Sequence, residues 1–131
     1  MWILGGNENY FADDPSFYRN DVWSSADGVA WTRLPDAPWK PRLWHSAVVY
    51  RDRIWGLGGN QSRTADFNDA WYSKDGIAWK QLKSKIVWKK RHEHSTWVHQ
   101  DRIWICGGTA EPGHLNNEVW SLFVPPDWFG E

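Results

Sequence analysis

Apolar residues gather in short runs along this chain, and the runs recur at a fixed spacing. The stretch at 42–59, RLWHSAVVYRDRIWGLGG, returns forty-nine residues later at 91–108 as RHEHSTWVHQDRIWICGG, with ten of eighteen positions identical. Each copy holds two apolar runs that are separated by a short polar segment and ended by paired glycines, which is typical of an antiparallel hairpin. No window shows the 3.6-residue period of an amphipathic helix. The pattern therefore predicts an all-β repeat protein.

Two further strands complete the repeating unit. A third strand is expected where Asn-Asp-x-Trp or Asn-Glu-x-Trp recurs, at 20–23, 68–71 and 117–120. In the first two copies an Asp-Gly pair follows, which is a strong hairpin signal because both turn residues take positive φ. Fourth strands are then expected at 29–34 and 77–82. The unit thus has four strands, and about ten strands are expected in all.

The spacing divides 1–131 into one partial domain of three units. Residues 1–41 form a unit that lacks its first strand, residues 42–90 form a complete unit, and residues 91–131 form one that lacks most of its fourth strand. In this last unit Val124-Pro125-Pro126-Asp127 replaces the Asp-Gly turn. About two and three-quarter units are therefore present.

The unit resembles the kelch repeat, whose period is about 50 residues. The resemblance rests on the Pro41-Arg42 entry, the Gly-Gly pairs, the Asn-Asp/Glu-x-Trp of strand three and the tryptophan of strand four. It implies a partial kelch-type β-propeller built from four-stranded antiparallel blades, of which a ring needs at least about four. We therefore expect further blades from a longer parent chain, or from a second copy in a homo-oligomer. The Ser-x-Asp-Gly-x-x-Trp runs at 25–31 and 73–79 are similar to the Asp-box of sialidase propellers, but they are one residue shorter and we interpret them as hairpin turns.

Composition narrows the possible partners. The net charge is −1 and no basic block occurs, which argues against nucleic acid or an anionic membrane as a partner. The opening residues MWILGGNENY have neither the basic nor the apolar region of a signal peptide, and the compartment stays unknown. The single cysteine, Cys106, excludes an intrachain disulfide. Thirteen tryptophans in repeating places indicate packing between blades, and Trp55 and Trp104 are expected to be mostly buried.

Candidate ligand-binding residues follow from the expected blade geometry. The start of each first strand and the long loops fall on one face of the disc, called here the long-loop face. This places together Arg42, His45, Ser46, Arg91, His94, Ser95, Asn7, Asn60 and Arg63. Two guanidinium groups at one channel mouth could clamp a carboxylate. Alternatively, each arginine ties its blade to the next, and the sequence leaves both readings open.

The favoured function is a binding module that takes a protein segment or a carbohydrate on the long-loop face. One alternative is part of a sugar-active enzyme similar to the kelch-type sialic acid mutarotases, and another is a structural segment of a larger propeller. The acids and bases available to an enzyme are Glu8, Glu93, Glu111, His45 and His94, but spacing assigns a catalytic role to none of them. The run His92-Glu93-His94 does not recur and has no third ligand at a telling spacing, so neither a metal nor a cofactor is expected.

Overall fold

The computed structural model describes residues 1–12, 14–62 and 65–130. Within these ranges the chain forms thirteen β-strands, two short 3-10 helices and no α-helix. The all-β prediction is confirmed, and three very short strands account for the excess over the ten expected. None of the helices in the described ranges is long and apolar enough to cross a bilayer.

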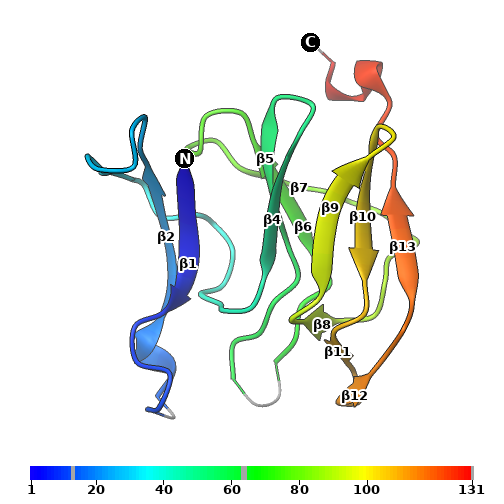
Figure 1. The fold of residues 1–131 in the computed structure, drawn as a ribbon, viewed down its shortest axis with the longest axis horizontal. Coiled ribbons are helices and arrows are strands. Elements are labelled where there is room, and N and C mark those ends of the chain that lie inside the picture. The colour runs from blue at the N-terminus through cyan, green and yellow to red at the C-terminus, as the bar shows by residue number, and fades with distance from the viewer. Residues whose placement is uncertain (13, 63–64, 131) are drawn as a thin grey trace.

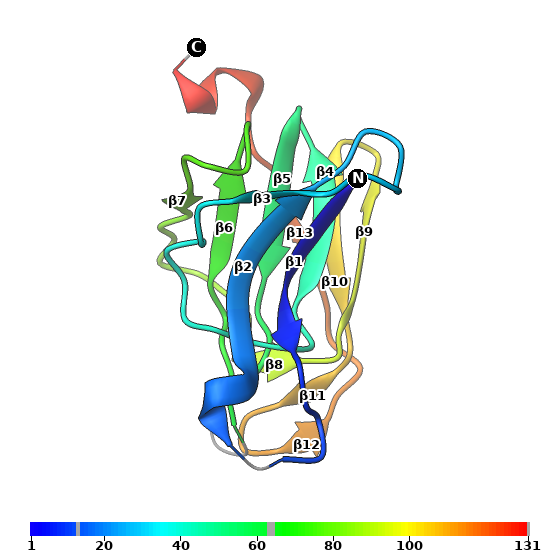
Figure 2. The same ribbon diagram turned by 90° about the vertical axis from the view of Figure 1, so that its left-hand side faces the viewer.

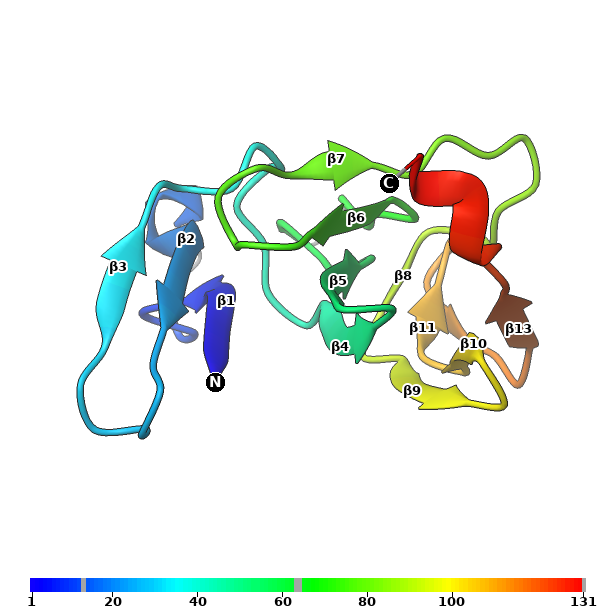
Figure 3. The same cartoon turned by 90° about the horizontal axis from the view of Figure 1, so that it is seen from above.

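Three antiparallel sheets, called blades 1 to 3, stand side by side (Figure 1). Blade 1 has the order β1 (Trp2–Asn7), β2 (Tyr18–Ser24), β3 (Thr32–Leu34). Blade 2 has the order β4 (Ser46–Tyr50), β5 (Arg53–Leu57), β6 (Ala70–Ser73), β7 (Lys80–Gln81). Blade 3 has the order β9 (Ser95–His99), β10 (Arg102–Cys106), β13 (Val119–Leu122). Seen from above, β1, β4 and β9 follow one side of the fan, which is its inner side (Figure 3).

The three additional strands form a small sheet at the end of the molecule where the long loops gather (Figures 1 and 2). They are β8 (Arg91–His92), β11 (Thr109–Ala110) and β12 (His114–Leu115), in the order β12-β11-β8. The 3-10 helix η1 (Pro15–Phe17) lies in the loop between β1 and β2, where Asp14 caps it by accepting from the Ser16 N–H. The hydrophobic pattern could not predict pairs this short, because two residues give no alternation to read.

The tight turns occur between the first and second strands. Arg51 and Asp52 have φ of 50° and 54°, and Gln100 and Asp101 have φ of 47° and 54°. Two consecutive residues with positive φ match the two-residue type I′ turn that right-handed strand twist favours. Tyr50 pairs with Arg53 across the first of these turns. The expected hairpins of strands one and two are therefore confirmed.

The Asp-Gly segments differ from the expected two-residue turn. Only Gly28 of the first pair has positive φ, at 79°, and the Asp27 carboxylate accepts hydrogen bonds from the N–H groups of Val29 and Ala30. Ser25 Oγ accepts from the Gly28 N–H at 2.8 Å. These bonds close a longer loop, so the fourth strand begins at Thr32 rather than at Val29. The second copy repeats every one of these bonds from Ser73 to Ala78, and its fourth strand is shortened to β7.

The core lies between the blades rather than within one of them. Between blades 1 and 2 the buried residues are Leu4, Val22, Ala37, Trp39 and Ile54. Between blades 2 and 3 they are Tyr50, Trp55, Leu57, Ala70, Trp88, Ile103, Ile105 and Val124. Trp55 is completely buried, as expected, whereas Trp104 is only partly buried and stacks on the exposed Trp97 with ring centroids 6.5 Å apart.

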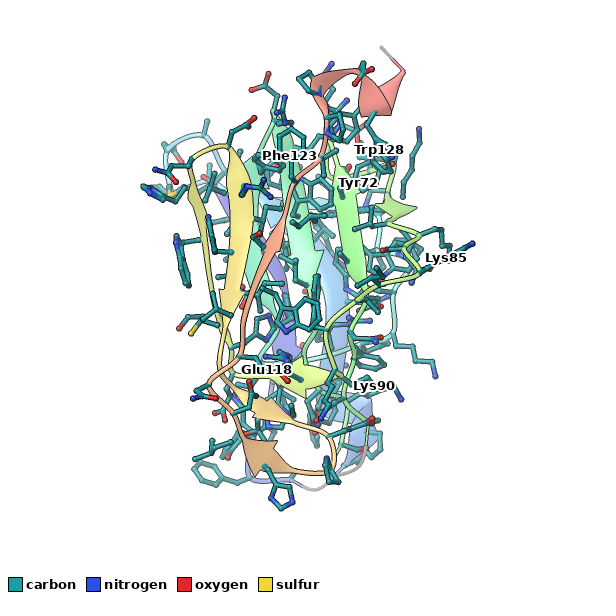
Figure 4. The ribbon with its side chains drawn as sticks, turned by 90° about the vertical axis from the view of Figure 1, so that its right-hand side faces the viewer. Tyr72, Lys85, Lys90, Glu118, Phe123 and Trp128 are labelled. Carbon is teal, nitrogen blue, oxygen red and sulfur yellow. The ribbon has the colours of Figure 1, made fainter. Side chains whose placement is uncertain are left out.

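The C-terminal segment turns back onto blade 2. After β13 the chain forms the 3-10 helix η2 (Pro126–Phe129) instead of a fourth strand. The Phe129 ring lies 5.5 Å from that of Tyr72, and the Arg53 guanidinium carbon lies 3.6 Å from the Phe129 centroid. Figure 4 shows Trp128 beside Tyr72, with their centroids 5.5 Å apart. This tail therefore covers the outer half of the core between blades 2 and 3.

Candidate functional site

The long-loop face has the arrangement that the repeat predicts. The loops that follow β1, β5 and β10 all reach the same end of the molecule, at the bottom of Figure 1. The strands β4 and β9 begin at this end, so the residues before them lie beside the loops. The candidate residues are thereby brought to one face, although their side chains do not share one environment.

Arg42 is 3% exposed, and all three of its side-chain nitrogens donate hydrogen bonds inside blade 2. Nε donates to the Lys40 carbonyl at 3.1 Å, and Nη1 to the Gly58 carbonyl at 2.8 Å. The two Nη atoms also hold the Asp69 carboxylate bidentately, at 2.6 and 3.0 Å. The Phe67 ring covers the guanidinium at 4.0 Å. Four of the five N–H groups of Arg42 thus have an acceptor within the protein, and the side chain is too buried to clamp a ligand.

Arg91 repeats this arrangement in blade 3 and is completely buried. Its Nε donates to the Lys89 carbonyl and its Nη1 to the Gly107 carbonyl, while Nη2 donates to the Glu118 carboxylate. Asn116 Oδ1 accepts a further bond from Nη1 at 3.0 Å. The contacts therefore support the structural reading of the two arginines, because both side chains are buried and already hold acceptors of the protein.

The arginines join blades through their backbone. The Gly6 N–H donates to the Arg42 carbonyl at 2.9 Å, and the Gly59 N–H donates to the Arg91 carbonyl at 3.0 Å. Each side chain therefore fixes the entry of its own blade, and each carbonyl receives the preceding blade. The side chain pairs with an acidic residue of its own blade, whereas the backbone carbonyl accepts from a glycine of the preceding blade. These two contacts explain why arginine, paired glycines and an acidic residue recur together in the sequence.

His94 and Ser46 lie at the boundary between blades 2 and 3. Ser46 Oγ donates to the His94 carbonyl at 2.9 Å. The His94 ring is 5% exposed and packs so closely on Gly58 that a Cβ there would stand 2.8 Å from its Cε1. His45 occupies the corresponding place between blades 1 and 2, and its Cβ lies beside Gly59. Ser95 is exposed.

Burial changes the acid-base behaviour of both histidines. Desolvation, with the charge of Arg91 and weaker repulsion from His45 and His92, lowers the pKa of His94 to about 4. Desolvation and the charge of Arg42 lower the pKa of His45 to about 4, although a backbone hydrogen bond with Leu4 and the charge of Asp69 oppose the change. Both rings are therefore neutral at pH 7 and serve as packing groups between blades.

Acid should consequently loosen the contact between blades 2 and 3. The unfolded chain binds a proton on His94 near pH 6.5, whereas the folded chain binds it only near pH 4. The contribution is full above about pH 6.5 and is lost as the pH falls toward 4, by up to about 3 kcal/mol. We expect urea unfolding at pH 7.5 and 4.5 to show a smaller loss of stability in His94→Gln than in the wild type. Equal pH dependence of the two proteins would contradict this assignment.

A groove of about 490 Å³ opens on the long-loop face between blades 1 and 2. Its aromatic and apolar lining comes from the loop after β1, the start of β2 and the link before β4. Its polar lining comes from the end of β1, the loop after β5 and β8. The lining residues are Asn7, Tyr10, Phe11, Ala12, Tyr18, Leu43, Trp44, Asn60, Ser62 and His92. This volume falls within the range of about 300 to 1,000 Å³ that is common for small-molecule sites.

Aromatic rings form one wall of this groove. Tyr10 packs edge-on against Trp44 with centroids 5.7 Å apart, and Trp44 stacks on His92 at 5.2 Å with an interplanar angle of 20°. Tyr10 is 60% exposed and Trp44 37% exposed, so both rings keep surface for a ligand. Trp44 has a φ of 54°, a conformation uncommon for a bulky residue. The loop geometry therefore holds a large aromatic ring in the groove.

Polar groups behind this wall fix its orientation. His92 Nδ1 lies 2.7 Å from Asp66 Oδ1, and the same carboxylate accepts from Asn60 Nδ2 at 2.7 Å. Asn60 is 5% exposed and its Oδ1 accepts from the Ser62 N–H, so it acts mainly as a support. Asn7 Oδ1 accepts from the Asn9 N–H, which leaves the Asn7 amide nitrogen at the groove.

The structure thus brings Asn7 and Asn60 together and separates them from the other candidates. Arg42 and Arg91 are internal, His45, Ser46 and His94 lie between blades, and Arg63 falls outside the described residues. Tyr10, Trp44 and His92 line the groove but are not among the candidate ligand-binding residues taken from the sequence. The available signal was that position 44 carries an aromatic residue where the next repeat has Glu93, so the repeat itself does not require it.

Within the described ranges, no group of three or more His, Cys, Asp or Glu side chains is arranged to hold an ion. His92 and His94 have different environments, since one lines the groove and the other is buried between blades.

Comparison with known proteins identifies the domain. No curated protein matches the chain. A family model described as the DUF6242 beta propeller domain matches residues 2–122. This range contains all thirteen strands and ends at the last residue of β13, so the sheets described above are propeller blades. The chain therefore belongs to the DUF6242 β-propeller domain family.

Proposed function

We propose that this chain is a kelch-type propeller segment that acts as a binding module and takes a carbohydrate in the groove of the long-loop face. The kelch assignment is supported by the forty-nine-residue repeat and by the ion pairs that the buried Arg42 and Arg91 form with Asp69 and Glu118 at repeat positions. The observation that carries the binding role is the wall of Tyr10, Trp44 and His92 beside amide and hydroxyl groups.

A neutral sugar fits this lining better than an acidic ligand. Within the described residues the groove is lined by no lysine or arginine. The two candidate arginines are buried and donate hydrogen bonds to acceptors inside the blades. Apolar ring faces of a pyranose can stack on Trp44 and Tyr10, while its hydroxyl groups meet Asn7, Ser62 and His92. A proline-rich peptide could also use aromatic rings, so a binding experiment must separate the two ligands.

Affinity electrophoresis through gels that contain soluble polysaccharides tests the proposal. We expect a neutral glucan, mannan, galactan or xylan to retard the protein, and we expect Trp44→Ala to weaken that interaction about tenfold or more, as is usual for a central aromatic contact. The matched control is Trp97→Ala, because Trp97 is 41% exposed against 37% for Trp44 and lies on β9 outside the groove.

Retardation that both variants lose equally would contradict a site at Trp44. Retardation by polygalacturonate alone would favour an acidic ligand, and binding of a proline-rich peptide without any polysaccharide binding would favour a protein segment as the ligand.

A second candidate function rests on the 2.7 Å contact between His92 and Asp66. A histidine oriented by a carboxylate at the edge of a groove has the arrangement of a general acid or base. It supports a sugar-active enzyme similar to the kelch-type sialic acid mutarotases. A chemical change in the bound sugar, followed by NMR during the same binding experiment, would favour this alternative over a binding module.

A further inference from the structure

A second groove, called here the lysine groove, opens at the outer rim of blade 2. It has a volume of about 470 Å³ and lies between the outer strands of this blade and the link to blade 3. Its lining residues are Asn68, Asp69, Ala70, Gln81, Leu82, Lys83, Ser84, Lys85, Val87 and Trp88. None of them lines the groove of the long-loop face. Figure 3 shows β7 on the outer side of the fan, so the two grooves are separate sites.

The repeat does not require the lysine groove. Between the leucine of strand four and the next tryptophan, the first copy has PDAP at 35–38, whereas the second has KSKIV at 83–87. In the first copy Ala37 is 2% exposed, and its N–H donates to the Asn20 carbonyl at 2.9 Å. In the second copy residues 83–87 are all exposed, and none of their N–H groups donates to the matching Asn68 carbonyl. The longer link therefore leaves open a place that blade 1 fills.

Positive charge is concentrated at this rim. Residues 74–90 contain six lysines and one aspartate, a net charge of +5 in a chain whose total is −1. All six lysines are exposed, and Figure 4 shows Lys85 and Lys90 on the same side of the molecule. In the described ranges Lys83 donates to a neutral acceptor, the Gln81 amide oxygen, and Lys85 forms no ion pair. Two ammonium groups at the groove are therefore available to carboxylates.

The one acidic residue among the described lining residues, Asp69, does not oppose an anionic ligand. Its carboxylate accepts from both Nη atoms of Arg42, at 2.6 and 3.0 Å, and from Trp71 Nε1 at 2.8 Å. The negative charge of Asp69 is thus compensated inside the blade. Charge complementarity consequently selects an acidic partner for this groove.

An extended peptide fits the lining better than an acidic polysaccharide or a nucleic acid. The Leu82 N–H donates to the Ala70 carbonyl at 2.8 Å, so the alternation of an antiparallel pair turns the Gln81 N–H and C=O away from β6. Such groups pair with the backbone of an added strand. Val87 is 39% exposed and offers an apolar contact. Sugar rings and bases stack on exposed aromatic faces, but Trp88, the one aromatic residue in the described lining, is 5% exposed.

We propose that the lysine groove binds an acidic, extended peptide segment of a partner protein. Carboxylates of this segment face Lys83 and Lys85, and its backbone pairs with Gln81. An anionic bilayer fits less well, because a flat surface does not enter a groove. The proposal does not depend on sugar binding at the long-loop face, and Trp44→Ala should leave peptide affinity unchanged.

The probe is a fluorescently labelled synthetic peptide of roughly ten residues, the length of a long strand, in which glutamate and valine alternate. We expect saturable binding at one site by fluorescence anisotropy. A peptide of the same length with glutamine in place of glutamate should bind about tenfold more weakly, and Lys85→Glu should weaken binding of the acidic peptide by about tenfold or more. The matched control is Lys40→Glu, which changes the net charge equally on an exposed lysine in the corresponding link of blade 1 and should leave affinity nearly unchanged.

Three results would overturn the proposal: no binding of the acidic peptide, equal affinity for the acidic and the glutamine peptide, or equal weakening by Lys85→Glu and Lys40→Glu. Lys85-dependent binding of polygalacturonate or of phosphatidylserine vesicles, without binding of the peptide, would assign the groove to another polyanion and would equally overturn it. The comparison of the two peptides uses the unaltered protein, so its result cannot come from misfolding.

Discussion

Replacing Arg91 by alanine is expected to lower the free energy of unfolding by about 3 to 5 kcal/mol, because it leaves a cavity and removes the donor from several acceptors at once. The side chain is completely buried and holds the Lys89 and Gly107 carbonyls as well as the Glu118 carboxylate. Hydrogen bonds from Trp120 and Arg91 lower the pKa of Glu118, so this carboxylate is charged at pH 7 and would lose a partner. Urea denaturation measures the loss.

Two further variants make this result specific. Arg33→Ala removes an arginine whose pair with Asp36 is exposed, with side-chain exposures of 56% and 49%, and should cost about 1 kcal/mol or less. Arg91→Lys keeps the charge, but one ammonium group cannot reach the four acceptors that the planar guanidinium holds, so this variant should remain destabilised. If Arg91→Ala were as stable as the wild type, the structural role of Arg91 would be contradicted and the carboxylate-clamp hypothesis would be favoured.

Trp55→Ala is expected to be comparably severe, with a loss of about 3 to 5 kcal/mol. The Trp55 ring has no exposed surface, and its Nε1 donates to the Tyr50 carbonyl at 3.0 Å. It lies 4.9 Å from the Tyr72 ring and 6.4 Å from that of Phe129, so its removal opens a cavity between blade 2 and the C-terminal tail. The thermal midpoint and the urea midpoint should both fall.

Trp104→Ala provides the comparison within the repeat. Trp104 holds the equivalent position but packs on an exposed neighbour, Trp97, rather than on another blade. We therefore expect a clearly smaller loss than for Trp55→Ala. Equal losses would mean that the flank of blade 3 is covered in solution.

Repeat spacing and turn chemistry were sufficient for the blade plan because both are local. The forty-nine-residue recurrence, the polar segment at 51–53 and the glycine pairs predicted the strands β4, β5, β9 and β10 and their hairpins. The fourth strands were predicted too long, since the Asp27 carboxylate binds successive N–H groups of its own loop and delays pairing until Thr32. The sequence shows an aspartate there but not which donors it reaches.

The candidate site could not be predicted from the sequence, because it depends on contacts between residues that are far apart along the chain. In the sequence, Arg42 was a candidate for ligand binding. Only the fold shows that the carboxylate of Asp69, twenty-seven residues away, accepts hydrogen bonds from both of its Nη atoms. Trp44, Tyr10 and His92 come from three separate loops and strands, and no spacing rule connects them. A repeat predicts what recurs, whereas a binding groove is built largely from residues that do not.

The sequence by itself determined that this protein is an array of antiparallel blades, because strand alternation, turn residues and repeat period are properties of neighbouring positions along the chain. Only the tertiary structure decided which polar groups are free. Hydrogen bonding between distant segments holds Arg42 and Arg91 in buried positions, and the packing of the loops leaves Trp44 at a groove. Such competition for partners depends on distances in space, which a linear pattern does not contain.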